Sequence, residues 1–175
     1  MSHIIKTEEH WKPFIMTGAI SAFLFLVYSI VTMILLLIVG GQPETVQECF
    51  SMLQKSKIIG LIRLDILTII VMPLYYLIFF AIYGTLKEYN EPATTFFTVI
   101  IFIGITMFLT ILPTSSLLKL SDTYESVSDI NVKNQIITAA QSLHAADMWH
   151  KTGAIIGGVF LQIGALAISI LMLKN

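Results

Sequence analysis

Four stretches of this chain are long enough to cross a lipid bilayer without meeting a charged residue, and they constrain the fold more than any other feature. They cover residues 14–39, 66–86, 92–118 and 152–173. A hydrocarbon core of about 30 Å needs roughly 20 apolar residues in helical conformation, so each stretch is long enough. Because backbone polar groups cannot remain unpaired in lipid, each stretch is expected to form a helix.

The composition agrees with a chain that is solvated mostly by lipid. Hydrophobic residues make up 56% of the sequence and charged residues 12%, whereas about a quarter of the residues of a soluble domain are charged. The sequence therefore predicts an all-α integral membrane four-helix bundle that forms a single domain over residues 1–175. The spans are predicted at about 13–39, 58–86, 92–118 and 152–173.

Two polar connections contain further helical patterns. Residues 44–55 place Val46, Phe50 and Leu53 on one helical face, and residues 130–148 contain no Gly or Pro. We expect both segments to be short interfacial amphipathic helices on one membrane face, although packing of 44–55 against the bundle would give the same pattern. The polar residues 87–91 predict a tight turn that makes the second and third spans antiparallel neighbours.

An even number of crossings places both termini on the same side of the membrane. The lysine counts of the two sides hardly differ, so the distribution of positive charge gives a weak preference. We expect cytoplasmic termini, mainly because the longer connections 40–57 and 119–151 are then outside. A formal net charge of −1 gives no reason to expect a nucleic-acid partner.

A cluster of ionisable residues is the strongest functional signal in the sequence. The predicted topology brings Arg63 and Asp65 to the same membrane face as His144, Asp147 and His150. An ionisable residue at membrane depth is costly unless it is paired or hydrated, so these five residues form a hypothetical ligand-binding site. In the alternative interpretation, Arg63 extends to the lipid headgroups and the pair only anchors its helix.

Metal and cofactor sites are not predicted. His144 and His150 would lie roughly 120° apart around a straight helix, so they would not bind one metal ion together. No predicted span has a histidine at its centre to bind haem, and motifs for nucleophilic catalysis or phosphate binding are missing. We therefore expect no cofactor and no catalytic residue. The sequence favours a protein without enzymatic activity.

Small residues in the last span predict close helix packing. Gly153 and Gly157 are four residues apart, Gly158 follows, and Gly18 in the first span offers a matching surface. Packing of these glycines within one chain and a homodimer through the last span remain alternatives.

The last third of the chain resembles an uncharacterised family of small prokaryotic multi-spanning membrane proteins. The resemblance lies in the segments 120–124 (LSDTY) and 139–143 (AAQSL), in Gly153 and in the closing Met172-Leu173. A weaker similarity covers Leu64-Asp65 and residues 83–86. It implies a multi-pass protein of a prokaryotic inner or plasma membrane. The family has no assigned activity, so the resemblance implies no reaction.

These observations lead to one functional hypothesis and two alternatives. The first is a non-enzymatic binding or sensing protein for a small polar-headed or lipid-like ligand at one membrane face. The second is a small membrane enzyme or transporter that uses the Arg, Asp and His cluster for proton transfer or metal binding. The third is a structural partner subunit of a membrane complex.

Overall fold

The computed structural model describes residues 2–64, 66–110, 113–145 and 152–174, and these residues form helices and short connections without any strand. In chain order, the helices are α1 (Ser2–Val39), α2 (Val46–Lys55), α3 (Lys57–Arg63), α4 (Ile66–Leu109), α5 (Thr114–Ser126), α6 (Ile130–Ala145) and α7 (Thr152–Lys174). Within the described part of the chain, three helical segments are long and apolar enough to cross a membrane: one lies in α1, one runs from α4 to α5, and one lies in α7.

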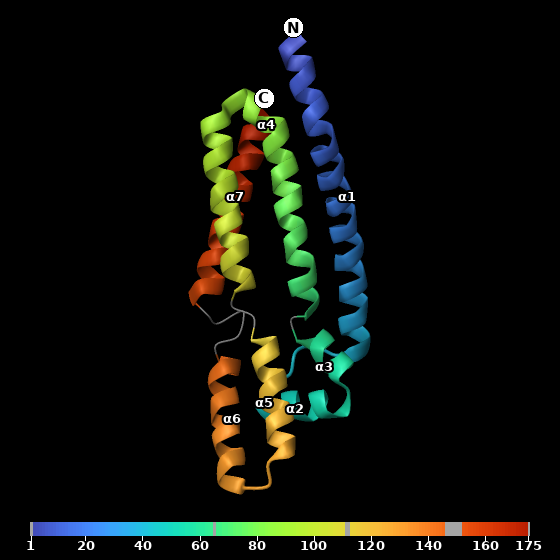
Figure 1. The fold of residues 1–175 in the computed structure, drawn as a ribbon, viewed down its shortest axis with the longest axis vertical. Coiled ribbons are helices and arrows are strands. Elements are labelled where there is room, and N and C mark those ends of the chain that lie inside the picture. The colour runs from blue at the N-terminus through green and yellow to red at the C-terminus, as the bar shows by residue number, and fades with distance from the viewer. Residues whose placement is uncertain (1, 65, 111–112, 146–151, 175) are drawn as a thin grey trace.

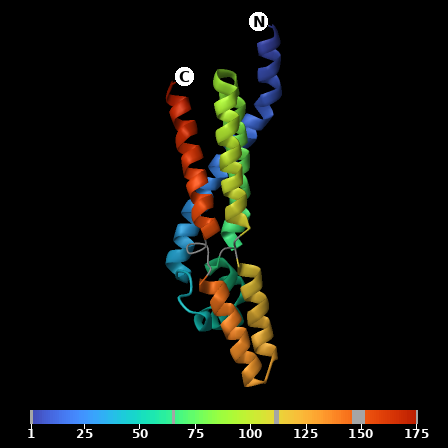
Figure 2. The ribbon, with the colours of Figure 1, turned by 90° about the vertical axis from the view of Figure 1, so that its left-hand side faces the viewer.

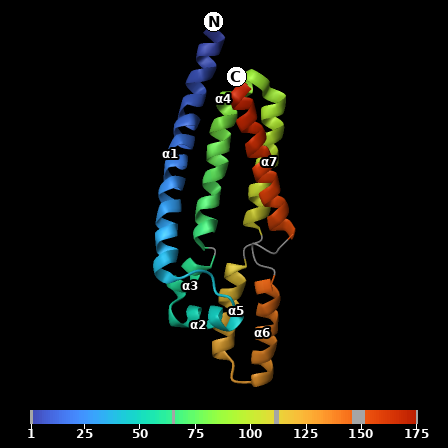
Figure 3. The ribbon, with the colours of Figure 1, turned by 180° about the vertical axis from the view of Figure 1, so that it is seen from behind.

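The molecule is elongated and has two parts (Figure 1). The long helices α1, α4 and α7 run side by side along the longest axis, and both chain ends lie at the same end of this group. The short helices α2, α3, α5 and α6 gather at the opposite end, and we call this group the head. Views from the side and from behind show the same division (Figures 2 and 3).

Helix α4 is a helical hairpin that reverses at Asn90. This residue has φ −153° and ψ 79°, and its side-chain Oδ1 accepts a hydrogen bond of 3.2 Å from the backbone N–H of Ala93. Asn90 thus caps a second helix, and Pro92 fits the first turn of this helix because its missing N–H needs no partner there. We call residues 66–89 the ascending arm and residues 91–109 the descending arm. The reversal falls within the predicted polar turn.

Two of the predicted spans are interrupted in the structure. The helix expected over 58–86 ends at Arg63 in α3 and resumes at Ile66, and the helix expected over 92–118 ends at Leu109. A new helix, α5, begins after Pro113, whose carbonyl accepts a hydrogen bond of 2.9 Å from the N–H of Leu117. The first break keeps the charge of Arg63 outside the long apolar helix. At the second, proline favours the start of a helix over its continuation.

Glycines set the spacing between the long helices. The descending arm and α7 approach backbone to backbone, because a Cβ added at Gly157 would lie 2.9 Å from the carbonyl oxygen of Gly104. Gly18 of α1 packs against Ala81 of the ascending arm, so it does not pair with the glycines of α7 as the sequence suggested. No heavy atom lies within 4 Å of a Cβ built at Gly158, so this glycine faces open space.

The apolar faces of the two helices expected at the membrane surface are covered by protein. Val46, Phe50 and Leu53 of α2 share a buried core with Leu117 of α5 and with Ile136 and Ala140 of α6. The predicted helix over 44–55 begins two residues later, at Val46, and does not present its apolar side to lipid. The second expected surface helix, α6, also packs on protein. It runs antiparallel to α5 along the long axis of the molecule, so it does not lie across the end of the long helices (Figure 2). The expectation of two flat interfacial helices is therefore corrected to a small helical head with its own core.

The adjacent glycines of α7 give a matched test of this packing. We expect Gly157→Ala to destabilise the protein by about 1 to 2 kcal/mol, because the new methyl group must push the backbone of the descending arm away. Gly158→Ala should leave the stability unchanged or slightly raised. Thermal unfolding in mild detergent measures both, and equal midpoints for the two variants would contradict the close contact.

Candidate functional site

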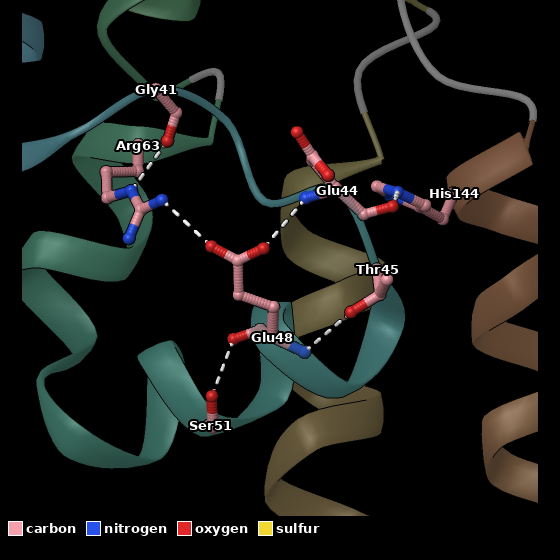
Figure 4. A network of polar contacts seen from close by, with 7 residues as sticks. All are labelled: Gly41, Glu44, Thr45, Glu48, Ser51, Arg63 and His144. Carbon is pink, nitrogen blue, oxygen red and sulfur yellow. Dashed lines mark hydrogen bonds and ion pairs between the residues drawn. The ribbon is translucent and has the colours of Figure 1, made fainter.

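Arg63 ties the head to the end of α1. It is the last residue of α3, and its Nε donates a hydrogen bond of 2.6 Å to the carbonyl oxygen of Gly41, just after α1 (Figure 4). Its Nη2 forms an ion pair and hydrogen bond of 3.1 Å with Oε1 of Glu48. Only 18% of the Arg63 side chain is exposed, so the guanidinium is largely committed to these contacts.

Glu48 is held in place by the start of its own helix. Its Oε2 accepts a hydrogen bond of 3.0 Å from the backbone N–H of Glu44, while its own N–H donates 3.1 Å to Oγ1 of Thr45, the N-cap of α2 (Figure 4). This arrangement is close to a capping box, in which a Thr and a Glu three residues later satisfy the free N–H groups of a helix start. Glu48 therefore serves two purposes, since one oxygen binds the turn and the other binds Arg63.

His144 joins the same group of contacts from α6. Its Nε2 lies 3.2 Å from the carbonyl oxygen of Glu44, and because a carbonyl only accepts, the imidazole Nε2–H is the donor (Figure 4). The connected residues thus run from α3 through the α1–α2 connection to the last turn of α6. We call Gly41, Glu44, Thr45, Glu48, Arg63 and His144 the neck cluster.

The neck cluster contains two of the five residues of the predicted ligand site. Arg63 and His144 both contact residues 41–48, although no contact joins them directly. Asp65, Asp147 and His150 lie outside the described residues. The partner that the sequence analysis missed is Glu48. The spacing Thr45-x-x-Glu48 marks Glu48 as part of a helix start, but no local signal marks it as the partner of Arg63.

The contacts of the neck cluster make it suited to holding helices together. The charges of Arg63 and Glu48 compensate each other, and the other hydrogen bonds of the cluster run to backbone atoms of its own residues. Within the part of the chain that the structure describes, no group of three His, Cys, Asp or Glu side chains is placed to hold a metal ion. This geometry gives Arg63 a structural role inside the protein, with Glu48 as its partner, instead of the expected extension to lipid headgroups.

Cys49 follows Glu48 and has the properties of a core residue. Its side chain is completely buried in the head. Burial, together with the negative charge of Glu48, raises the pKa of the Cys49 thiol to about 11. Since the thiolate is the nucleophile, a thiol that stays protonated at neutral pH is not a catalytic candidate.

An open groove lies between α5 and α6. Its volume is about 640 Å³. It is lined by the first two turns of α5 and the last two turns of α6, namely Ser115, Ser116, Lys119, Leu120, Ala139, Ser142 and Leu143. These turns are the ends of α5 and α6 nearest to the long helices (Figure 1). We call this cavity the α5–α6 groove.

Comparison with known proteins adds no identity to this geometry. No protein-family model matches the chain, no curated protein matches it, and no solved structure matches it. The resemblance to a family of prokaryotic multi-spanning proteins therefore stays a prediction, and the site has to be interpreted from its own chemistry.

A double-mutant cycle tests the central ion pair of the neck cluster. We expect Arg63→Ala and Glu48→Ala each to lower stability, and the coupling between them to be about 1 kcal/mol, as for a partly buried charged hydrogen bond. The ion pair between Lys57 and Asp122, 2.8 Å long and well exposed, is the control, and its cycle should show no measurable coupling. Additive effects of the Arg63 and Glu48 substitutions would show that the pair is not coupled.

Cys49 provides a pH test of the head. Because its pKa rises from 9.0 to about 11 on folding, the unfolded chain loses this proton first, and stability should fall as the pH rises from about 9 to 11. Below pH 9 this contribution should be constant. Native protein at pH 8 should react with iodoacetamide at least 100-fold more slowly than unfolded protein, and equally fast alkylation would contradict the burial.

Proposed function

We propose that this protein is a multi-pass membrane protein that binds a polar-headed, lipid-like ligand at one membrane face without catalysing a reaction. The membrane location is supported by the distribution of exposed apolar side chains. They cover α1, both arms of α4 and α7, as Phe23, Ile70, Phe96 and Leu166 illustrate. Contiguous apolar surface of this extent is unfavourable in water and favourable in lipid.

The arrangement of the long helices supports four crossings in this proposal. α1, the two arms of α4 and α7 each run along the same axis, and both termini lie at one end of the molecule (Figure 1). The head then lies on the opposite side of the membrane. The proposal keeps the termini in the cytoplasm of a prokaryotic cell, with the head outside.

The ligand is assigned to the α5–α6 groove because of its position and lining. The groove starts just after the descending arm, at the depth where a bilayer around the long helices would place its headgroups. The lining is mostly apolar, and its polar groups come from three serines and from Lys119, whose ammonium carries a positive charge. This combination suits a phosphate-bearing headgroup with part of its acyl chain.

The other hypotheses have less support in the geometry. Proton transfer or metal binding would need a free cluster, whereas Arg63 and His144 are engaged in contacts that join helices. A binding role requires only the groove and the membrane, so it is the function that we put forward.

Native mass spectrometry of protein extracted in mild detergent tests this proposal. Wild-type protein should retain an anionic phospholipid, and Ser142→Leu should abolish retention by filling the groove. Lys119→Gln should weaken it roughly fivefold, as expected for the loss of about 1 kcal/mol from one lysine near a lipid surface.

Lys133→Gln is the matched control, because Lys133 lies over the ring of Tyr124 and outside the groove. Its retention of lipid should equal that of wild type. If folded Ser142→Leu protein retains as much phospholipid as wild type, the groove is not the binding site.

A further inference from the structure

Helix α3 exposes two adjacent apolar side chains on the surface of the head. Ile58 is 73% exposed and Ile59 is 43% exposed. In the described residues of the head, the other large exposed apolar side chains are Ile130 and Val132, at the far end of the α5–α6 hairpin. Two adjacent exposed isoleucines in the first turn of a short helix need a partner that the head does not supply.

The position of α3 indicates what that partner is. α3 contacts α1, and Gly40, which ends α1 with φ 96°, lies beside the guanidinium of Arg63. The last turn of α1 is itself apolar and exposed at Leu37 and Ile38. The exposed isoleucines of α3 and the exposed apolar end of α1 therefore belong to two helices in contact.

The length of α1 supports the same conclusion. Its apolar part, His10–Val39, has 30 residues and measures about 45 Å, whereas the descending arm of 19 residues measures about 29 Å. The end of α1 therefore has residues to spare beyond a hydrocarbon core of about 30 Å, and α3 runs from the head towards that level and ends there, with Arg63 beside Gly40 (Figure 3). This is the depth of lipid headgroups.

The charges around α3 suit that environment. Lys55 ends α2, Lys57 begins α3, and both side chains are exposed. Lys57 Nζ is 2.8 Å from Oδ1 of Asp122, so Lys55 is the more available cation. Basic residues beside exposed isoleucines match a surface of phosphate groups above acyl chains.

We propose that α3 is an interfacial anchor that inserts Ile58 and Ile59 into the headgroup region of a phospholipid bilayer. The inference rests on the membrane location proposed above. It gives the surface role to α3, whereas the sequence pattern had indicated residues 44–55 and 130–148. Because Arg63 ends α3 and binds Glu48, the anchor joins the lipid surface directly to the neck cluster.

Depth measurements at three positions of similar exposure test this proposal. Phe23→Cys in α1, Ile58→Cys in α3 and Ile130→Cys at the far end of the head are each labelled with an environment-sensitive fluorophore, since 65% of both Phe23 and Ile130 is exposed. The buried Cys49 should stay unlabelled in the native protein. The full-length protein is placed in vesicles of phosphatidylcholine and phosphatidylglycerol, three to one, with or without brominated acyl chains.

The expected order of quenching is Phe23, then Ile58, then Ile130. Quenching at Ile58 should be at least half of that at Phe23 and several-fold above that at Ile130. If Phe23 is quenched while Ile58 matches Ile130, α3 is not an anchor and the membrane location stands. If Phe23 is not quenched either, the membrane location itself fails.

Discussion

The fold of this protein depends on the hairpin of α4, because α1 and α7 both pack on it. One residue, Asn90, leaves helical conformation and caps the arm that follows, so the chain reverses without a loop. The two arms then provide separate surfaces. Gly18 of α1 fits against the ascending arm, and Gly157 of α7 fits against Gly104 of the descending arm. Small residues allow this approach, which brings many backbone and side-chain atoms into van der Waals contact.

The head is stabilised in a different way from the long helices. Its core joins α2, α5 and α6 through completely or largely buried side chains, and its polar groups gather at the neck cluster. An ion pair inside this cluster connects α2 to α3, and backbone carbonyls accept from Arg63 and His144. Arg63 and His144, two of the five residues of the predicted ligand site, are thus part of the joint between the head and the long helices. The α5–α6 groove is the surface that we propose for a ligand.

The sequence predicted the helical class and the long apolar segments because hydrophobicity over 20 residues is a local property. The interruptions near Leu64 and Pro113 were harder to predict. At each, whether the apolar helix continues or ends depends on contacts with other parts of the chain. Thr45 and Glu48 were visible as a capping pair, yet the ion pair with Arg63 joins residues 15 positions apart and has no local signature. The faces of α2 and α6 showed the same ambiguity, because an apolar stripe fits lipid and protein equally well.

The amino-acid sequence alone determined that the chain is helical and that it contains long apolar segments, because both properties follow from residue types along short segments. Only the tertiary structure decided which glycine meets which helix, that the apolar stripe of α2 faces α5 and α6, and that Arg63 binds Glu48. Those choices depend on the relative positions of segments far apart in the chain. They are fixed by packing and by pairing of charges, which no single segment contains.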